Sequence, residues 1–244
     1  MVLAMLAGCV EAPERGHSAD LADGEDEDEG EPDPVLLTLS PAAIEARCDA
    51  IKATAAARGI TNPLVIAGVA NHETHLVQCL SEWPIHCAGP YSADCGGPVL
   101  AGSGDGPCGA QQGGLGMFQF DAGTYPQTLS AYGDGVLSVA GNIDGGIDVI
   151  IHKLRVCQHT SALVPSDEAA IDFINRARPG TTEYEQYMST MASCYNGCQP
   201  HYTSCSHEGM RANYKAGVQG ILDQLGEEYW DAPPTAAAAA GSRF

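Results

Sequence analysis

The sequence predicts a mainly α-helical domain that carries one long irregular insert. Apolar residues recur at helical spacing in several segments between residues 40 and 226. Ser, Thr or Pro, which favour helix starts, precede several of these segments. The stretch 80–114 breaks the pattern and is rich in Gly, Pro and Cys, which indicates a long loop pinned by disulfides. A β-hairpin within this stretch is a second interpretation.

Local signals predict the first two helices. Ser40 and Pro41 suit the cap and the first position of a helix that runs up to Gly59. Its apolar residues at helical spacing are Ile44, Cys48 and Ile51. The second helix is predicted over 63–76 and has an apolar body.

Four further helices are predicted after the insert. The segment 143–157 has Ile and Leu at helical spacing. Thr182 and Glu185 form a capping-box pattern for a later helix. The four predicted helices cover about 143–157, Ser166 to Asn175, 183–196 and 209–226.

Charge divides the chain into parts. It has 31 acidic and 11 basic residues, a net charge of -20, and residues 1–34 hold 11 of the acidic residues and one basic residue. Such a self-repelling run cannot form a core, so 10–36 is expected to be a disordered spacer. Residues 37–230 are the predicted folded domain, and 231–244 a disordered tail. The acidic balance argues against a nucleic-acid partner, which would need a basic face.

The N-terminus contains a candidate lipidation motif. Leu6, Ala7, Gly8 and Cys9 resemble the lipobox of bacterial lipoproteins. The resemblance implies that 1–9 is a signal remnant, that Cys9 carries lipid, and that the lipid is the protein's contact with the membrane. The protein would then be exported to the cell envelope, on the periplasmic or surface face of the outer membrane. An ordinary apolar N-terminus is the alternative.

Ten cysteines in a chain that looks exported indicate disulfides. Without Cys9 the count is odd, so at least one thiol has no partner within the chain, and the connectivity is open. One group has enough ligands for a zinc knuckle as an alternative: Cys194, Cys198, His201, Cys205 and His207. Disulfides are preferred, so no metal and no cofactor is predicted.

A carboxylate between two imidazoles follows the apolar second helix. His72 and His75 are three residues apart, whereas a zinc-protease helix needs histidines four apart on one face. Glu73 near the end of this helix would be half-desolvated, which raises a carboxyl pKa and suits a general acid. The alternative is a solvated residue at a helix end.

Further motifs point to a family. Gly116 to Asp121 read Gly-Met-Phe-Gln-Phe-Asp, and Tyr195, Asn196 and Gly197 follow later, before the segment Tyr214–Leu222. In this order, with Glu73-Thr74-His75, they resemble the soluble lytic transglycosylase and goose-type lysozyme superfamily over about residues 60–225. The resemblance implies a lysozyme-like helical fold, here with an unusually long Gly- and Cys-rich insert. The Pro-x-Thr that follows the family's Gln turn is absent, which leaves the subfamily open.

The resemblance also implies roles for residues of this chain. Glu73 would be the general acid and base, and Asp121 a second carboxylate that holds water in a hydrolase. Tyr195 would lie against Glu73 and help to hold its carboxyl. The residues implied in substrate binding are Thr74, His75, Met117, Phe118, Gln119, Tyr195 and Asn196. For Asp121, Gln119, Met117, Phe118 and Tyr195, a purely structural role is the alternative.

The implied activity is cleavage of the β-1,4 bond between N-acetylmuramic acid and N-acetylglucosamine in peptidoglycan. Lytic transglycosylation is favoured over goose-type hydrolysis because of the Tyr-Asn-Gly motif, although His75 and Asp121 match the goose type. Two other functions remain open: an inactive peptidoglycan-binding or structural lipoprotein, and a zinc hydrolase.

Overall fold

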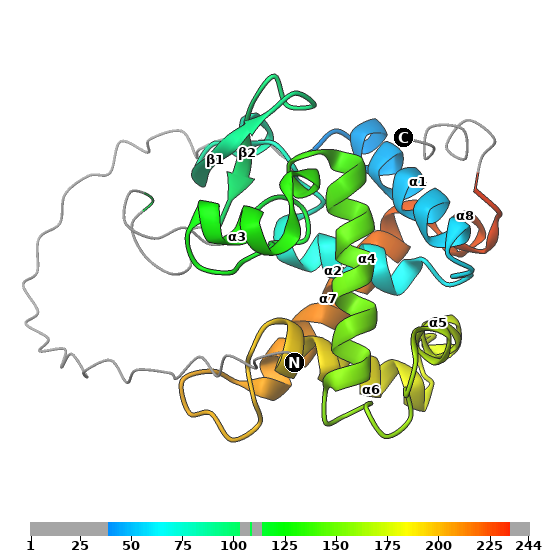
Figure 1. The fold of residues 1–244 in the computed structure, drawn as a ribbon. Coiled ribbons are helices and arrows are strands. Elements are labelled where there is room, and N and C mark those ends of the chain that lie inside the picture. The colour runs from blue at the N-terminus through cyan, green and yellow to red at the C-terminus, as the bar shows by residue number, and fades with distance from the viewer. Residues whose placement is uncertain (1–38, 103–107, 109–113, 235–244) are drawn as a thin grey trace, which may run out of the picture. The chain divides into compact units, whose positions relative to one another are not determined.

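A computed structural model describes residues 39–102, 108 and 114–234, and this part of the chain is mainly helical (Figure 1). The predictions for Cys9, the spacer 10–36 and most of the tail lie outside these residues. The helices are α1 (Pro41–Ala57), α2 (Leu64–Thr74), α3 (Tyr125–Tyr132), α4 (Val139–Val156), α5 (Asp167–Arg176), α6 (Thr182–Thr190), α7 (His207–Leu225) and α8 (Glu227–Asp231). Short 3-10 turns lie at Leu80–Glu82 and Asp134–Leu137, and a π-helical turn at Met191–Tyr195. In the described residues, no helix is long and apolar enough to cross a membrane.

The predicted caps at Ser40 and Ser166 are confirmed. The Ser40 hydroxyl accepts the backbone N–H of Ala43, and the Ser166 hydroxyl accepts that of Ala169. The capping box predicted at Thr182 is wrong by one residue, because Thr181 is the cap and its hydroxyl accepts the N–H of Tyr184. The helix predicted over 183–196 ends its regular α-turns at Thr190 and continues as the π-helical turn.

Two helix starts differ from the prediction after the insert. Helix α3 was not predicted; the Gln127 side chain accepts the N–H of Thr124 at its start. Helix α4 begins at Val139 rather than 143, where the Ser138 hydroxyl accepts the N–H of Gly141. The turn between Asp134 and Leu137 leads directly from one helix to the other.

The insert contains the β-hairpin that the sequence left as a second interpretation. Strand β1 (Cys87–Ser92) pairs antiparallel with β2 (Gly97–Ala101). Disulfides pin this region, as predicted: Cys79 bonds to Cys95, and Cys87 to Cys108.

The remaining cysteines argue against the zinc knuckle. Cys157 bonds to Cys194, and Cys198 to Cys205, so the thiols proposed as zinc ligands are consumed. Cys48 is the free thiol of the described residues, and it is buried in α1. Its burial raises its pKa to about 12.

Two glycines allow α2 and α7 to cross closely. A Cβ on Gly68 would lie 2.2 Å from Val218 Cγ2, and a Cβ on Gly217 would lie 2.6 Å from the carbonyl oxygen of Gly68. Helix α4 crosses in front of both helices in Figure 1. Its apolar face joins the same core through Ile143, Ile147, Ile150 and Leu154. The last turn of α2 is therefore held from several sides.

Candidate active site

Glu73 lies in the last turn of α2 and is half-buried. The helix body before it, Leu64–Ala70, is buried throughout. The carboxyl oxygen Oε1 accepts a hydrogen bond of 2.5 Å from the hydroxyl of Tyr214. Burial raises the pKa of Glu73 from 4.5 to about 7, and the hydrogen bond from Tyr214 opposes this rise. Near neutrality the carboxyl is therefore protonated in a large fraction of molecules.

Tyr214 is placed by the close crossing of α7 on α2. Gly217 lies one turn after it on α7 and meets the α2 backbone at Gly68. The ring of His72 packs against the tyrosine, with centroids 4.2 Å apart. The motif resemblance includes the segment Tyr214–Leu222 but implies no role for this tyrosine. The sequence does place Tyr214 three residues before Gly217 within the predicted helix 209–226.

Tyr195 does not hold the carboxyl in the way expected from the sequence. Its hydroxyl donates instead to the carbonyl oxygen of Phe118 at 2.5 Å. Burial is the main cause that raises the pKa of the Tyr195 hydroxyl, and the negative charge of Glu73 raises it further. Tyr195 therefore connects the π-helical turn to the turn at Phe118, while Tyr214 contacts the acid.

The turn Gly116–Gln119 packs against the end of α2. The Thr74 hydroxyl lies 3.1 Å from the carbonyl oxygen of Met117. Gln119 has a positive φ of 50°, and its Nε2 donates to the carbonyl oxygen of Gly116 at 2.8 Å. The Thr74 contact ties the turn to α2, and the Tyr195 contact ties it to the π-helical turn.

Two buried amides that the sequence analysis missed hold the same turn. The Oε1 of Gln78 accepts the N–H of Met117, and the Oδ1 of Asn142 accepts the N–H of Phe118, both at 3.0 Å. Both side chains are 0% exposed. A Cβ on Gly116 would lie 2.5 Å from each of them, so this position requires glycine.

Three residues expected to bind substrate are structural. Thr74 is 1% exposed, Met117 0% and Phe118 1%, so these side chains pack in the interior of the protein. The Phe118 ring packs on α4, where a Cβ added at Gly146 would lie 2.4 Å from the ring. Phe118 and Met117 belong to the core, and Thr74 binds backbone carbonyls.

The other predicted site residues reach solvent. His75, Asp121 and Asn196 are exposed, and Gln119 is half-buried. His75 ends α2 in a left-handed conformation, and its ring lies 5.2 Å from that of Trp83. The Oδ1 of Asp121 accepts the N–H of Gly123 at 2.7 Å.

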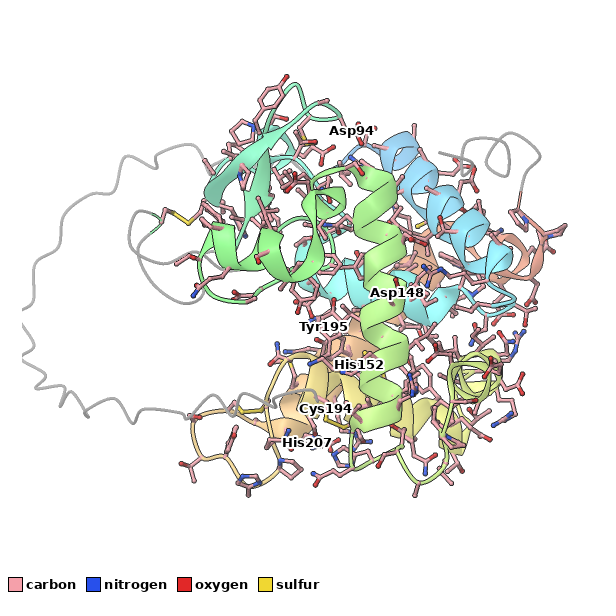
Figure 2. The ribbon with its side chains drawn as sticks, viewed as in Figure 1. Asp94, Asp148, His152, Cys194, Tyr195 and His207 are labelled. Carbon is pink, nitrogen blue, oxygen red and sulfur yellow. A yellow bond between two sulfur atoms is a disulfide. The ribbon has the colours of Figure 1, made fainter. Side chains whose placement is uncertain are left out.

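A hollow of about 110 Å³ brings several of these residues together. Its lining is Phe118, Gln119, Phe120, Asp121, Tyr132, Val149, Lys153 and Tyr195. Figure 2 shows Tyr195 beside the middle of α4. The structure thus gathers Gln119, Asp121 and Tyr195 around one hollow, whereas Glu73 is not among the residues that line it.

In the part of the chain that the structure describes, no group of three or more His, Cys, Asp or Glu side chains is arranged to hold a metal ion. Comparisons of the chain with protein-family models, with curated proteins and with solved structures give no match. The residues of the site supply a half-buried carboxyl on Glu73, a hydrogen-bond donor on Tyr214, and a hollow lined by Gln119, Asp121 and Tyr195.

Proposed function

We propose that this protein cleaves the β-1,4 glycosidic bond between N-acetylmuramic acid and N-acetylglucosamine in peptidoglycan, with Glu73 as the proton donor. The observation that carries the proposal is the half-buried Glu73 carboxyl at the end of an apolar helix, held by the Tyr214 hydroxyl, where burial raises its pKa to about 7. Cleavage of a glycosidic bond requires a protonated acid at the leaving oxygen. The proposal also rests on the motif resemblance, which supplies the substrate class.

The favoured reaction is lytic transglycosylation. Protonated Glu73 gives its proton to the bridging oxygen, and the bond from that oxygen to C1 of the muramyl sugar breaks. The resulting Glu73 carboxylate then takes the proton of the muramyl C6 hydroxyl. That oxygen bonds to C1 and gives a 1,6-anhydro product. Glu73 ends protonated again, and no water is consumed.

Tyr214 suits both halves of this cycle. Its hydroxyl holds one carboxyl oxygen at 2.5 Å and leaves the other for the substrate. A group that must give and then take a proton works best with a pKa near the working pH. The opposing effects of burial and the Tyr214 hydroxyl leave Glu73 in that range.

Hydrolysis is the second candidate, and the exposure of Asp121 favours it. Asp121 lines the hollow that it shares with Gln119 and Tyr195. An inverting hydrolase needs a second carboxylate to activate water on the opposite face of the sugar. In that case the product has a free reducing end in place of the anhydro ring.

The test is incubation of the full-length protein with purified peptidoglycan, followed by mass spectrometry of the released fragments. Anhydro-muramyl ends support transglycosylation, and reducing ends support hydrolysis. Glu73→Gln should abolish release, whereas Glu228→Gln, an exposed glutamate on α8, should not. A protein that binds peptidoglycan equally well with and without Glu73, and releases nothing, is a binding module and contradicts the proposal.

We also propose that the protein is exported and anchored through lipid on Cys9. Four disulfides in the described residues suit an oxidising compartment. Incorporation of labelled palmitate in a bacterial host should depend on Cys9, and its persistence in Cys9→Ser would contradict the anchor.

A further inference from the structure

A second and larger hollow adjoins the one at Gln119. Its volume is about 640 Å³, within the range of ligand pockets. It shares four lining residues with the smaller hollow: Phe120, Tyr132, Val149 and Lys153. We call the two together the α4 groove. The remaining lining of the larger part is Ala131, Gly135, Val136, Gly141, Asp144, Gly145, Asp148 and His152.

The sequence of α4 explains why the groove follows the helix. Gly141, Gly145, Val149 and Lys153 recur every four residues and so share one side of α4. Gly141 and Gly145 let other parts of the lining approach the helix: a Cβ on Gly141 would lie 2.2 Å from the carbonyl oxygen of Gly135, and one on Gly145 would lie 3.0 Å from the Phe120 ring. Twelve helical steps span about 18 Å. An extended peptide advances roughly 3.3 Å per residue, so the groove matches about five residues.

One end of the α4 groove has its charges paired. Arg58 bonds to both Asp144 and Asp148, which line the larger hollow. Figure 2 shows Asp148 and His152 on the same face of α4. The carboxylates at this end are therefore partly neutralised by the protein itself.

The other end presents an unpaired cation. Lys153 is half-buried and, among the described residues, has no ion-pair partner. Burial lowers its pKa, because the ammonium loses hydration without gaining a counter-charge. It lies where the two hollows meet, and Gln119, Asp121 and Tyr195 line the smaller one. A bound carboxylate would supply the missing counter-charge.

We propose that the α4 groove binds the peptide attached to the muramyl sugar, and that Lys153 pairs with a carboxylate of this peptide. The inference rests on the proposed function, since it names the part of peptidoglycan that lies beside the cleaved bond. Peptides of the wall carry carboxylates and small apolar side chains, which suit Lys153 and the Gly, Ala and Val lining. Chitin-type glycan has no carboxylate and gains nothing from this contact. The protein therefore prefers peptide-bearing strands.

The test measures binding by calorimetry with full-length Glu73→Gln protein, so that no ligand is cleaved. The three ligands are the N-acetylglucosamine–N-acetylmuramic acid disaccharide with its peptide, the same disaccharide without peptide, and chitobiose. The peptide-bearing ligand should bind most tightly. Adding Lys153→Met should weaken its binding about 10-fold or more, the effect of one charge-assisted hydrogen bond, and leave chitobiose unchanged. Lys153→Arg should retain most of the preference.

Arg155→Met is the matched control, because Arg155 is an exposed cation on the same helix that pairs with Asp167 outside the groove. It should keep the preference, and circular dichroism should show that every variant is folded. Equal binding of the peptide-bearing ligand with and without the Lys153 ammonium overturns the inference. So does equal binding of the two muramyl ligands, because the lactyl carboxylate is then sufficient. In either case, fragment release by the unsubstituted protein tells whether the proposed function survives.

Discussion

Replacing Glu73 by Gln should make the protein more stable at alkaline pH, although it removes the proposed catalytic group. The folded carboxyl has a pKa of about 7, against 4.5 ordinarily. Between these values the folded state binds more protons than the unfolded state, so stability falls as pH rises. Each pKa unit corresponds to about 1.4 kcal/mol, and the total loss is up to about 3 kcal/mol above pH 8. Gln has no charge to bury and keeps an oxygen for the Tyr214 hydroxyl.

The assay is urea unfolding followed by circular dichroism, with disulfides intact, from pH 4 to 9. Other titrating groups cancel in the difference between the two proteins. This difference should be small near pH 4 and should grow in favour of Glu73→Gln as pH passes 7. Glu228→Gln, an exposed replacement, should show no such trend. Parallel stability curves for Glu73→Gln and the unsubstituted protein would refute the reasoning, because the carboxyl would then be hydrated in both states.

Three further experiments test the Tyr214 hydrogen bond, the crossing of α2 and α7, and the buried thiol of Cys48. Tyr214→Phe removes the donor that lowers the pKa of Glu73, so the alkaline limb of kcat/KM should move up by about 1–2 pH units, and a downward shift contradicts this. Gly217→Ala places a Cβ 2.6 Å from the carbonyl oxygen of Gly68. Thermal unfolding should therefore show that the free energy of unfolding falls by about 1–3 kcal/mol. Cys48, whose pKa is about 12, should resist a thiol reagent at pH 8 until urea unfolds the chain, as peptide mapping can check.

Helices with strong local signals could be predicted, and weaker ones could not. Ser40 and Ser166 cap their helices through bonds to residues three positions later, so the information is contained within one turn. Helix α3 does carry a local signal, the capping pair Thr124 and Gln127, but it lacks a buried apolar face, because Thr128 is its one fully buried residue. The sequence does not decide between a loop and the hairpin, because Gly and Pro interrupt both strands. Disulfides rather than alternating apolar residues fix the place of the hairpin.

The sequence could predict the half-desolvated carboxyl of the candidate site, but not the residues that hold it and the neighbouring turn in place. Glu73 follows a long apolar run, so neighbouring residues in the sequence predict its desolvation. Its partner Tyr214 lies 141 residues away. The sequence assigns no role to Gln78 or Asn142. Their burial depends on N–H groups of the Met117 turn, which the fold brings to them.

The proton affinity of Glu73 is set by helix packing rather than by neighbouring charge. The two influences on its pKa are burial, which raises it, and the Tyr214 hydroxyl, which lowers it. Both depend on the distance between α2 and α7, and Gly68 and Gly217 set that distance because neither has a side chain to separate the helices. A wider crossing would admit water and lengthen the hydrogen bond at the same time. These glycines therefore support the proposed chemistry as directly as the residues that line the hollow.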